Sequence, residues 1–113
     1  MILNKEVIIT IAILFFTQMV VWYQINGQLI SNWAREHPMI LSLAGFPISY
    51  LFILSTKYGY EGFGVLWPIR LLGFATGMIS FPFITYLMLG EGITIKTGIS
   101  ILLSVVIMLL QLI

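Results

Sequence analysis

The chain has 113 residues, of which 60% are hydrophobic and 8% carry charge, with five Lys or Arg against four Asp or Glu. A soluble globular domain carries roughly 25% charged residues, so the composition excludes a soluble enzyme, a disordered chain and, with no cysteine, a disulfide-stapled secreted module. A net charge of +1 gives no basic surface for nucleic acid, which we do not expect as a partner.

Charged clusters divide the chain into four apolar stretches, and the mean hydropathy of the whole chain is +1.10. A helix needs roughly 20 apolar residues to cross a hydrocarbon layer about 30 Å thick. The pattern predicts an all-α, polytopic membrane protein in which residues 1–113 form a single domain. Its four transmembrane helices form an antiparallel bundle, and they cover about residues 7–30, 39–56, 63–89 and 93–113.

Three short connections separate the predicted helices. Residues 31–38 contain a charged pair and end in Pro38, a residue type that suits the first turn of a helix. Residues 57–64 (KYGYEGFG) are rich in glycine, which predicts a turn. Residues 90–92 (Gly-Glu-Gly) predict a tight turn, after which Thr94 or Thr97 caps the last helix. Connections this short make successive helices antiparallel.

The first stretch carries an unusual set of polar side chains. Positions seven apart lie almost on one line along a helix, so Thr10, Thr17 and Gln24 share a line, and Gln18 lies about 80° from it. Such side chains can hydrogen-bond between helices and serve packing alone. Each buried amide needs several partners, however, which favours a polar cavity beside this helix.

The other stretches carry small residues at helical spacing. In lipid, small side chains let two helix backbones approach closely. Packing is therefore the favoured role for these positions, although they could also line a polar path. The residues predicted to pack helices together are Ser42, Ser49, Gly73, Gly77 and Ser104.

Arg70 is the charged residue whose role depends on where its helix begins. A helix that starts at Phe63 places Arg70 about 10 Å along it, where a fixed charge marks an anion or substrate contact. A helix that starts at Trp67 and Pro68 places Arg70 in the first turn, from which it can reach lipid phosphates. Both interpretations stay open from the sequence.

No carboxylate lies within a predicted span, since the four acids are at the span ends. A proton-coupled pump usually keeps an ionisable group inside the bilayer. Transport by this chain would therefore work without a membrane-embedded carboxylate. His37 has no second ligand at metal spacing, and no nucleophile–base set is present. We expect no catalytic residues, no metal site, no cofactor and no enzymatic activity.

The loop charges are nearly balanced across the membrane. Lys5 and Lys57 lie at one end, with Arg70 if it reaches back, while Arg35 and Lys96 lie at the other. The positive-inside rule then sets almost no preference for orientation. Because four short helices enclose little volume, a polar path would need two copies. The expected partners are membrane lipid and a second copy, in a homodimer that can be antiparallel.

Residues 86–109 (YLMLGEGITIKTGISILLSVVIML) resemble the last hairpin of the drug/metabolite transporter superfamily, with Gly90, Glu91, Thr94, Lys96 and Gly98 in the matching places. The size and layout resemble its small multidrug resistance branch. Residues 20–28 (VVWYQINGQ) are similar to small four-span relatives of that branch. The resemblance implies a dimeric four-helix bundle that binds cationic compounds, metabolites or lipid-linked sugars between its copies.

One departure from that family changes the expected substrate. The small multidrug resistance branch relies on a glutamate embedded in its first helix, whereas this chain has Thr17 and Gln18 in that region. A site lined by glutamine with Arg70 nearby suits a neutral or anionic substrate, such as a sugar or a lipid head group.

The leading hypothesis is a small transporter that moves a polar metabolite or a lipid-linked head group across a bacterial inner membrane. Aromatic rings among its expected site residues could stack on a ring or a sugar face. The substrate-binding residues that we expect are Gln18, Trp22, Gln24, Tyr50 and Arg70. The alternative is a subunit that transports nothing and packs in, or helps to assemble, a larger membrane complex.

Overall fold

The computed structural model describes residues 3–113, which form helices and no strand. Within that part of the chain, four segments are long and apolar enough to cross a membrane: Lys5–Leu29, Pro38–Phe63, Trp67–Leu89 and Ile95–Leu112. The all-α, polytopic prediction is confirmed. The helices are α1 (Lys5–Asn26), the 3-10 turn η1 (Gly27–Leu29), α2 (Asn32–Glu36), α3 (Pro38–Ser42), α4 (Gly45–Phe63), α5 (Trp67–Leu89) and α6 (Ile95–Leu112).

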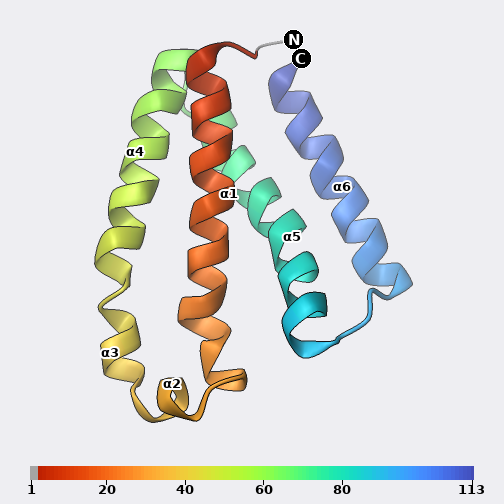
Figure 1. Ribbon diagram of the computed structural model, residues 1–113. Coiled ribbons are helices and arrows are strands. Elements are labelled where there is room, and N and C mark those ends of the chain that lie inside the picture. The colour runs from red at the N-terminus through yellow and green to blue at the C-terminus, as the bar shows by residue number, and fades with distance from the viewer. Residues whose placement is uncertain (1–2) are drawn as a thin grey trace.

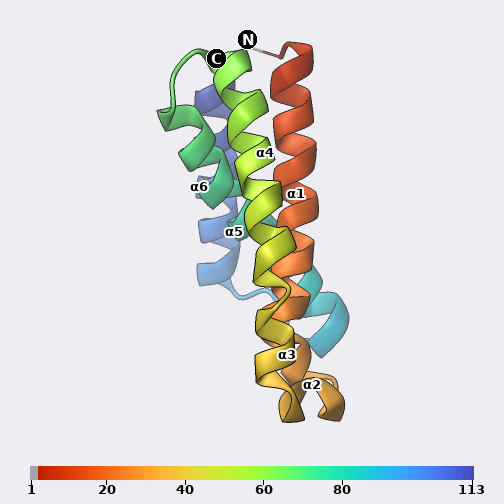
Figure 2. The same cartoon turned by 90° about the vertical axis from the view of Figure 1, so that its left-hand side faces the viewer.

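Successive spans run antiparallel, and the start of α1 and the end of α6 lie at the same end of the bundle (Figure 1). Helix α1 packs against α4 and α5, and α6 packs against α5, whereas α4 and α5 touch each other far less. The bundle is flattened, with extents of 44 × 35 × 18 Å. Figure 2 shows α4 beside α1, with α6 behind them. Helices α1 and α5 therefore form its centre.

The centre of the bundle buries hydroxyl side chains as well as Leu14 and Leu72. Most of these hydroxyls return a hydrogen bond to their own helix, as Thr10 does to the carbonyl of Glu6 at 2.8 Å and Thr17 to that of Ile13 at 2.6 Å. Within residues 3–113, no buried side-chain nitrogen or oxygen lacks a partner. These threonines supply small, satisfied packing surfaces in a medium without water.

The second span is interrupted between α3 and α4. Pro47 has no backbone N–H, so the carbonyl of Leu43 loses its regular helical partner. The backbone tightens there, with Ala44 donating to the carbonyl of Leu41 and Phe46 donating to that of Leu43. Such shorter bonds are common where an α-helix is disturbed. The break lies in the half of the span near α2.

The predicted turn at residues 57–64 is wrong, because α4 continues as a helix to Phe63. Its glycines permit close approach between helices. A Cβ on Gly59 would lie 2.7 Å from Cγ1 of Ile69, and one on Gly62 would lie 2.8 Å from Cγ2 of Val7. The helix ends at Gly64, whose φ of 77° is a left-handed conformation that glycine adopts without strain.

The other helix boundaries follow the local signals in the sequence. Pro38 and Pro68 lie in the first turns of α3 and α5. Gly90, with a φ of 71°, ends α5, and the Thr94 side chain caps α6 by accepting a hydrogen bond from the backbone of Thr97. The stretch predicted as loop 31–38 contains α2, which Ser31 caps.

We predict that Gly59→Ala destabilises the protein by about 1–3 kcal/mol, because its Cβ would overlap the buried Ile69 side chain. The matched control is Gly73→Ala, whose Cβ would meet no atom within 4 Å. That variant should keep or raise stability, since alanine favours a helix over glycine by up to about 1 kcal/mol. Thermal unfolding in detergent micelles measures the stability of both variants. Equal stability of the two would contradict the close contact between Gly59 and Ile69.

Candidate functional site

A cleft of about 600 Å³ lies between α1, α4 and α5. It exists because α4 and α5 both pack on α1 and barely on each other. Its volume lies in the range of about 300–1,000 Å³ that small-molecule sites occupy. The walls are mostly apolar, and the lining includes Gln18, Phe52, Ser55, Thr56, Arg70 and Gly73.

The cleft extends from one membrane interface toward the middle of the bilayer. Gln18 lies 13 residues beyond Lys5, which is about 20 Å along α1 at 1.5 Å per residue. In a hydrocarbon layer about 30 Å thick, that position is well inside the layer. Arg70 is three residues beyond Trp67, about 5 Å from the start of α5. The Gln18 amide bonds to Gly73, three residues beyond Arg70, so the two polar ends of the cleft differ in depth by about one helical turn.

Gln18 joins α1 to α5 and also faces the cleft. Its Nε2 donates a hydrogen bond to the carbonyl of Gly73 at 3.0 Å. Its amide lies close against Gly77, where a Cβ would come within 3.2 Å of it. Its Oε1 accepts no hydrogen bond within residues 3–113, and it is not fully buried, because no fully buried side-chain nitrogen or oxygen there lacks a partner. One end of the amide thus packs helices, while the other offers an acceptor.

Arg70 lies in the first turn of α5, because the helix begins at Trp67. The structure thereby selects the second of the two positions considered from the sequence. Its guanidinium lies 5.3 Å from the centroid of the Phe74 ring, and it pairs with no carboxylate in residues 3–113. A cation–π contact at an exposed site contributes about 0.5–1 kcal/mol and leaves the N–H donors of the guanidinium available.

Trp22 lies beyond the deep end of the cleft. Its Nε1 donates a buried hydrogen bond to Oγ1 of Thr85 at 2.9 Å. This bond joins α1 to α5 one helical turn past Gln18. Two further buried hydroxyl residues of α5, Thr76 and Ser80, lie between the levels of Gly73 and Thr85. The space between α1 and α5 is therefore filled at this level by buried polar side chains.

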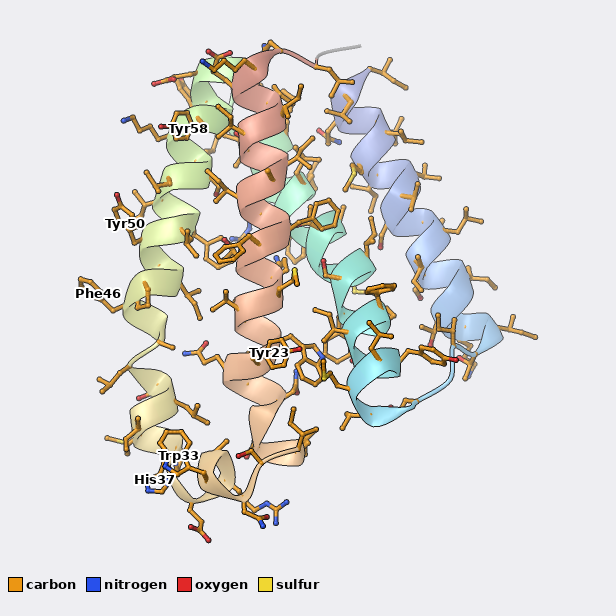
Figure 3. The ribbon with its side chains drawn as sticks, viewed as in Figure 1. Tyr23, Trp33, His37, Phe46, Tyr50 and Tyr58 are labelled. Atoms are coloured by element: carbon orange, nitrogen blue, oxygen red, sulfur yellow. The ribbon has the colours of Figure 1, made fainter. Side chains whose placement is uncertain are left out.

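Gln24 and Tyr50 lie outside the cleft. Gln24 donates through Nε2 to the carbonyl of Leu41 at 3.2 Å, at the break between α3 and α4. It lines a smaller hollow of about 290 Å³ near the opposite end of the bundle. Tyr50 is 59% exposed and points away from the bundle on α4 (Figure 3). Of the five expected substrate-binding residues, Gln18 and Arg70 share the cleft.

The residues expected to pack helices also separate into groups. Gly77 makes a close contact with Gln18, and Ser104 is buried in α6, the helix that packs on α5. Gly73 instead lines the open cleft. Ser42 and Ser49 are exposed on α3 and α4, so within one copy they do not pack against a neighbouring helix.

Ser55 and Thr56 are polar cleft residues that were not among the site residues expected from the sequence. Their hydroxyls both donate to the carbonyl of Phe52, at 2.8 and 3.0 Å. Thr56 continues the seven-residue spacing of Ser42 and Ser49, and this spacing is the only sequence feature that points to its place on the same helix face. Because both hydroxyl protons are committed to the backbone, these side chains can only accept further hydrogen bonds.

No family model, curated protein or solved structure matches the chain. Among the described residues, no group of three or more His, Cys, Asp or Glu could hold a metal ion.

The contact between Trp22 and Thr85 can be measured by a double-mutant cycle with Trp22→Phe and Thr85→Val. We expect a coupling free energy of about 0.6–1.7 kcal/mol, the range of hydrogen bonds between membrane helices. Unfolding of the wild type, the two single variants and the double variant in mixed detergent micelles measures this coupling free energy. As a control, Trp22→Phe combined with Ser104→Ala should be additive within about 0.5 kcal/mol, because these residues are on helices that do not pack together. No coupling between Trp22 and Thr85 would contradict the assigned hydrogen bond.

Proposed function

We propose that this multi-pass membrane protein is a small transporter of the drug/metabolite transporter type, which moves a polar metabolite or a lipid-linked head group. The observation that carries the proposal is the cleft, whose mostly apolar walls hold the Arg70 guanidinium, which pairs with no carboxylate, near the start of α5 and an amide oxygen of Gln18 without a hydrogen-bond partner about one helical turn deeper. Polar groups without a protein partner are costly inside a membrane, so they favour a role in binding.

The proposed cycle begins with the cleft open toward the membrane end where α5 starts. Beyond Gln18 the path is closed by the hydrogen bond between Trp22 and Thr85. Passage requires α1 and α5 to separate at that level while the cleft closes. No carboxylate lies along the path, since Glu6 and Glu61 are near one end of the bundle and Glu36 and Glu91 near the other. Proton transfer through an embedded acid is therefore not part of the cycle.

The transport proposal is tested with the purified protein in liposomes, using two probes: chain-labelled fluorescent phosphatidylglycerol, read by quenching with dithionite, and radiolabelled glycerol 3-phosphate. Flux of at least one probe should exceed that of protein-free liposomes. Gln18→Leu should lower that flux roughly tenfold, because a lost hydrogen bond to a polar ligand is worth about 1.4 kcal/mol.

The matched control is Gln111→Leu, the same change on α6 outside the cleft, which should leave the flux unchanged. Wild-type flux equal to that of protein-free liposomes for both probes would overturn the transport proposal. Equal flux in the wild type and in Gln18→Leu would remove Gln18 from the site.

We further propose that the protein acts as a homodimer in the bacterial inner membrane, with its two copies antiparallel. The near-balance of Lys5 and Lys57 against Arg35 and Lys96 supports insertion in both orientations. The limited contact between α4 and α5 leaves one side of the cleft for a second copy or for lipid.

Orientation can be read from a single introduced thiol, because the natural chain contains no cysteine. In Lys96→Cys, the thiol lies at the start of α6, at one membrane end. An impermeant maleimide should label about half of the protein in intact cells and all of it after the cells are opened, as the loop charges allow both orientations. Labelling of none or of all of the protein in intact cells would remove the antiparallel arrangement.

The alternative function is a membrane subunit that transports nothing. It is favoured by one observation, namely that Gln18, Trp22 and Gln24 each donate to a neighbouring helix and so contribute to packing. Purification from native membranes separates the two functions. A stable complex with other membrane proteins, together with no flux from the isolated chain, would support the subunit.

A further inference from the structure

Free hydrogen-bond donors and acceptors are distributed unevenly along the cleft. One of the two amide protons of Gln18 is engaged at Gly73, and the hydroxyl protons of Ser55 and Thr56 are engaged at Phe52. Most donors without a protein partner are found at the mouth, where Arg70 and the 75% exposed Trp67 lie. The deep end offers mainly acceptors, foremost Oε1 of Gln18, beside the second amide proton of that residue. A ligand that satisfies both ends has an anion at the interface and hydroxyl groups further in.

The charge of the cleft selects the sign of the ligand. Arg70 is the charged residue in its lining, and neither Glu6 nor Glu61 contributes to it. A guanidinium binds phosphate and carboxylate oxygens through paired N–H groups. Arg70 lies in the first turn of α5, from which its long side chain can reach toward lipid phosphates. A cationic ligand would meet an unfavourable charge there and find no carboxylate in return.

The shape of the cleft indicates a ligand that comes from the membrane. Helices α4 and α5 touch each other little, so contact between these two helices does not close the cleft on that side. Arg70 and Gly73 are separated by about 5 Å along α5, which is the length of a head group and not of a whole lipid. The acyl chains of a bound lipid can therefore stay in the bilayer while its head group enters.

We propose that the cleft binds the head group of an anionic, hydroxyl-bearing lipid from the leaflet in which α5 begins. Arg70 binds the phosphate, and Oε1 of Gln18 accepts a hydrogen bond from a head-group hydroxyl. The acyl chains leave between α4 and α5. This inference rests on the proposed function in that it names the substrate class of the same cleft, but it concerns binding and is tested without flux.

The experiment measures lipid selectivity in nanodiscs of phosphatidylcholine. Phosphatidylglycerol with a spin label on one acyl chain serves as the probe, because its head group is unmodified, and the motionally restricted fraction reports binding. The wild type should prefer phosphatidylglycerol over phosphatidylcholine. Arg70→Gln should lower this preference about tenfold, as expected for the loss of a charge-assisted contact.

The matched control for charge is Lys57→Gln. Lys57 is on α4, six residues before its end, so it lies near the same interface, but it is outside the cleft lining and its Nζ lies over the Tyr58 ring at 5.6 Å. This variant should keep the preference. An equal loss in Lys57→Gln and Arg70→Gln would overturn the proposal, because general attraction of anionic lipid to surface charge would then explain the selectivity.

A second variant tests the cleft without removing a charge. Gly73→Leu fills open space, since a Cβ at Gly73 meets no atom within 4 Å, and it should lower the preference as strongly as Arg70→Gln. Gly98→Leu makes the same change on α6, outside the cleft lining, and should leave the preference intact. Thermal unfolding of each variant checks that it is folded. A folded Gly73→Leu protein with unchanged preference would overturn the proposal.

Two further comparisons define the ligand. Phosphatidylethanol keeps the phosphate but has no free hydroxyl, so it should bind the wild type more weakly than phosphatidylglycerol does. In Gln18→Leu, the two lipids should bind equally well. Glycerol 3-phosphate should not displace the spin-labelled lipid at equal concentration; displacement would show a water-soluble ligand and overturn the lipid source. Lipid preference without flux would refute transport alone, whereas flux without lipid preference would refute this inference alone.

Discussion

Hydrocarbon supplies no hydrogen-bond partners, and this constraint explains where the polar side chains of the protein lie. Each polar group within a span must be satisfied by the chain itself or face a hollow. Gln18, Trp22 and Gln24 each donate from α1 to a different place: the backbone of α5, a hydroxyl of α5 and the broken backbone between α3 and α4. Helix α1 is consequently the element that holds the other helices in position.

Glycine serves three different physical purposes in this bundle. Gly64 and Gly90 adopt left-handed backbone conformations that end α4 and α5. Gly59 and Gly77 admit close neighbours, an isoleucine side chain in one case and the amide of Gln18 in the other. Gly73 has no close neighbour and leaves part of the cleft empty. The same residue type therefore creates chain turns, helix contacts and open volume.

The cleft combines properties that usually exclude one another in a membrane. Its walls are apolar enough to face lipid, and yet Arg70 and the oxygen of Gln18 have no protein partner within residues 3–113. Its two uncommitted ends differ in chemistry, with donors near the start of α5 and an acceptor about one helical turn deeper. This polarity along the cleft supports an amphiphilic, anionic ligand over a cation, and no carboxylate lines the cleft.

The sequence by itself determined the membrane class, the four spans and most helix ends, because apolar length, proline at a first turn and threonine caps are local properties of the chain. It could not determine the role of the glycines in residues 57–64, since turn formation and close packing require the same absence of a side chain. Only the tertiary structure decided that Gln18 and Arg70 share a cleft while Gln24 and Tyr50 lie elsewhere. The physical reason is that helical periodicity fixes the face on which a residue lies, whereas the partner of that face depends on how α1, α4 and α5 pack.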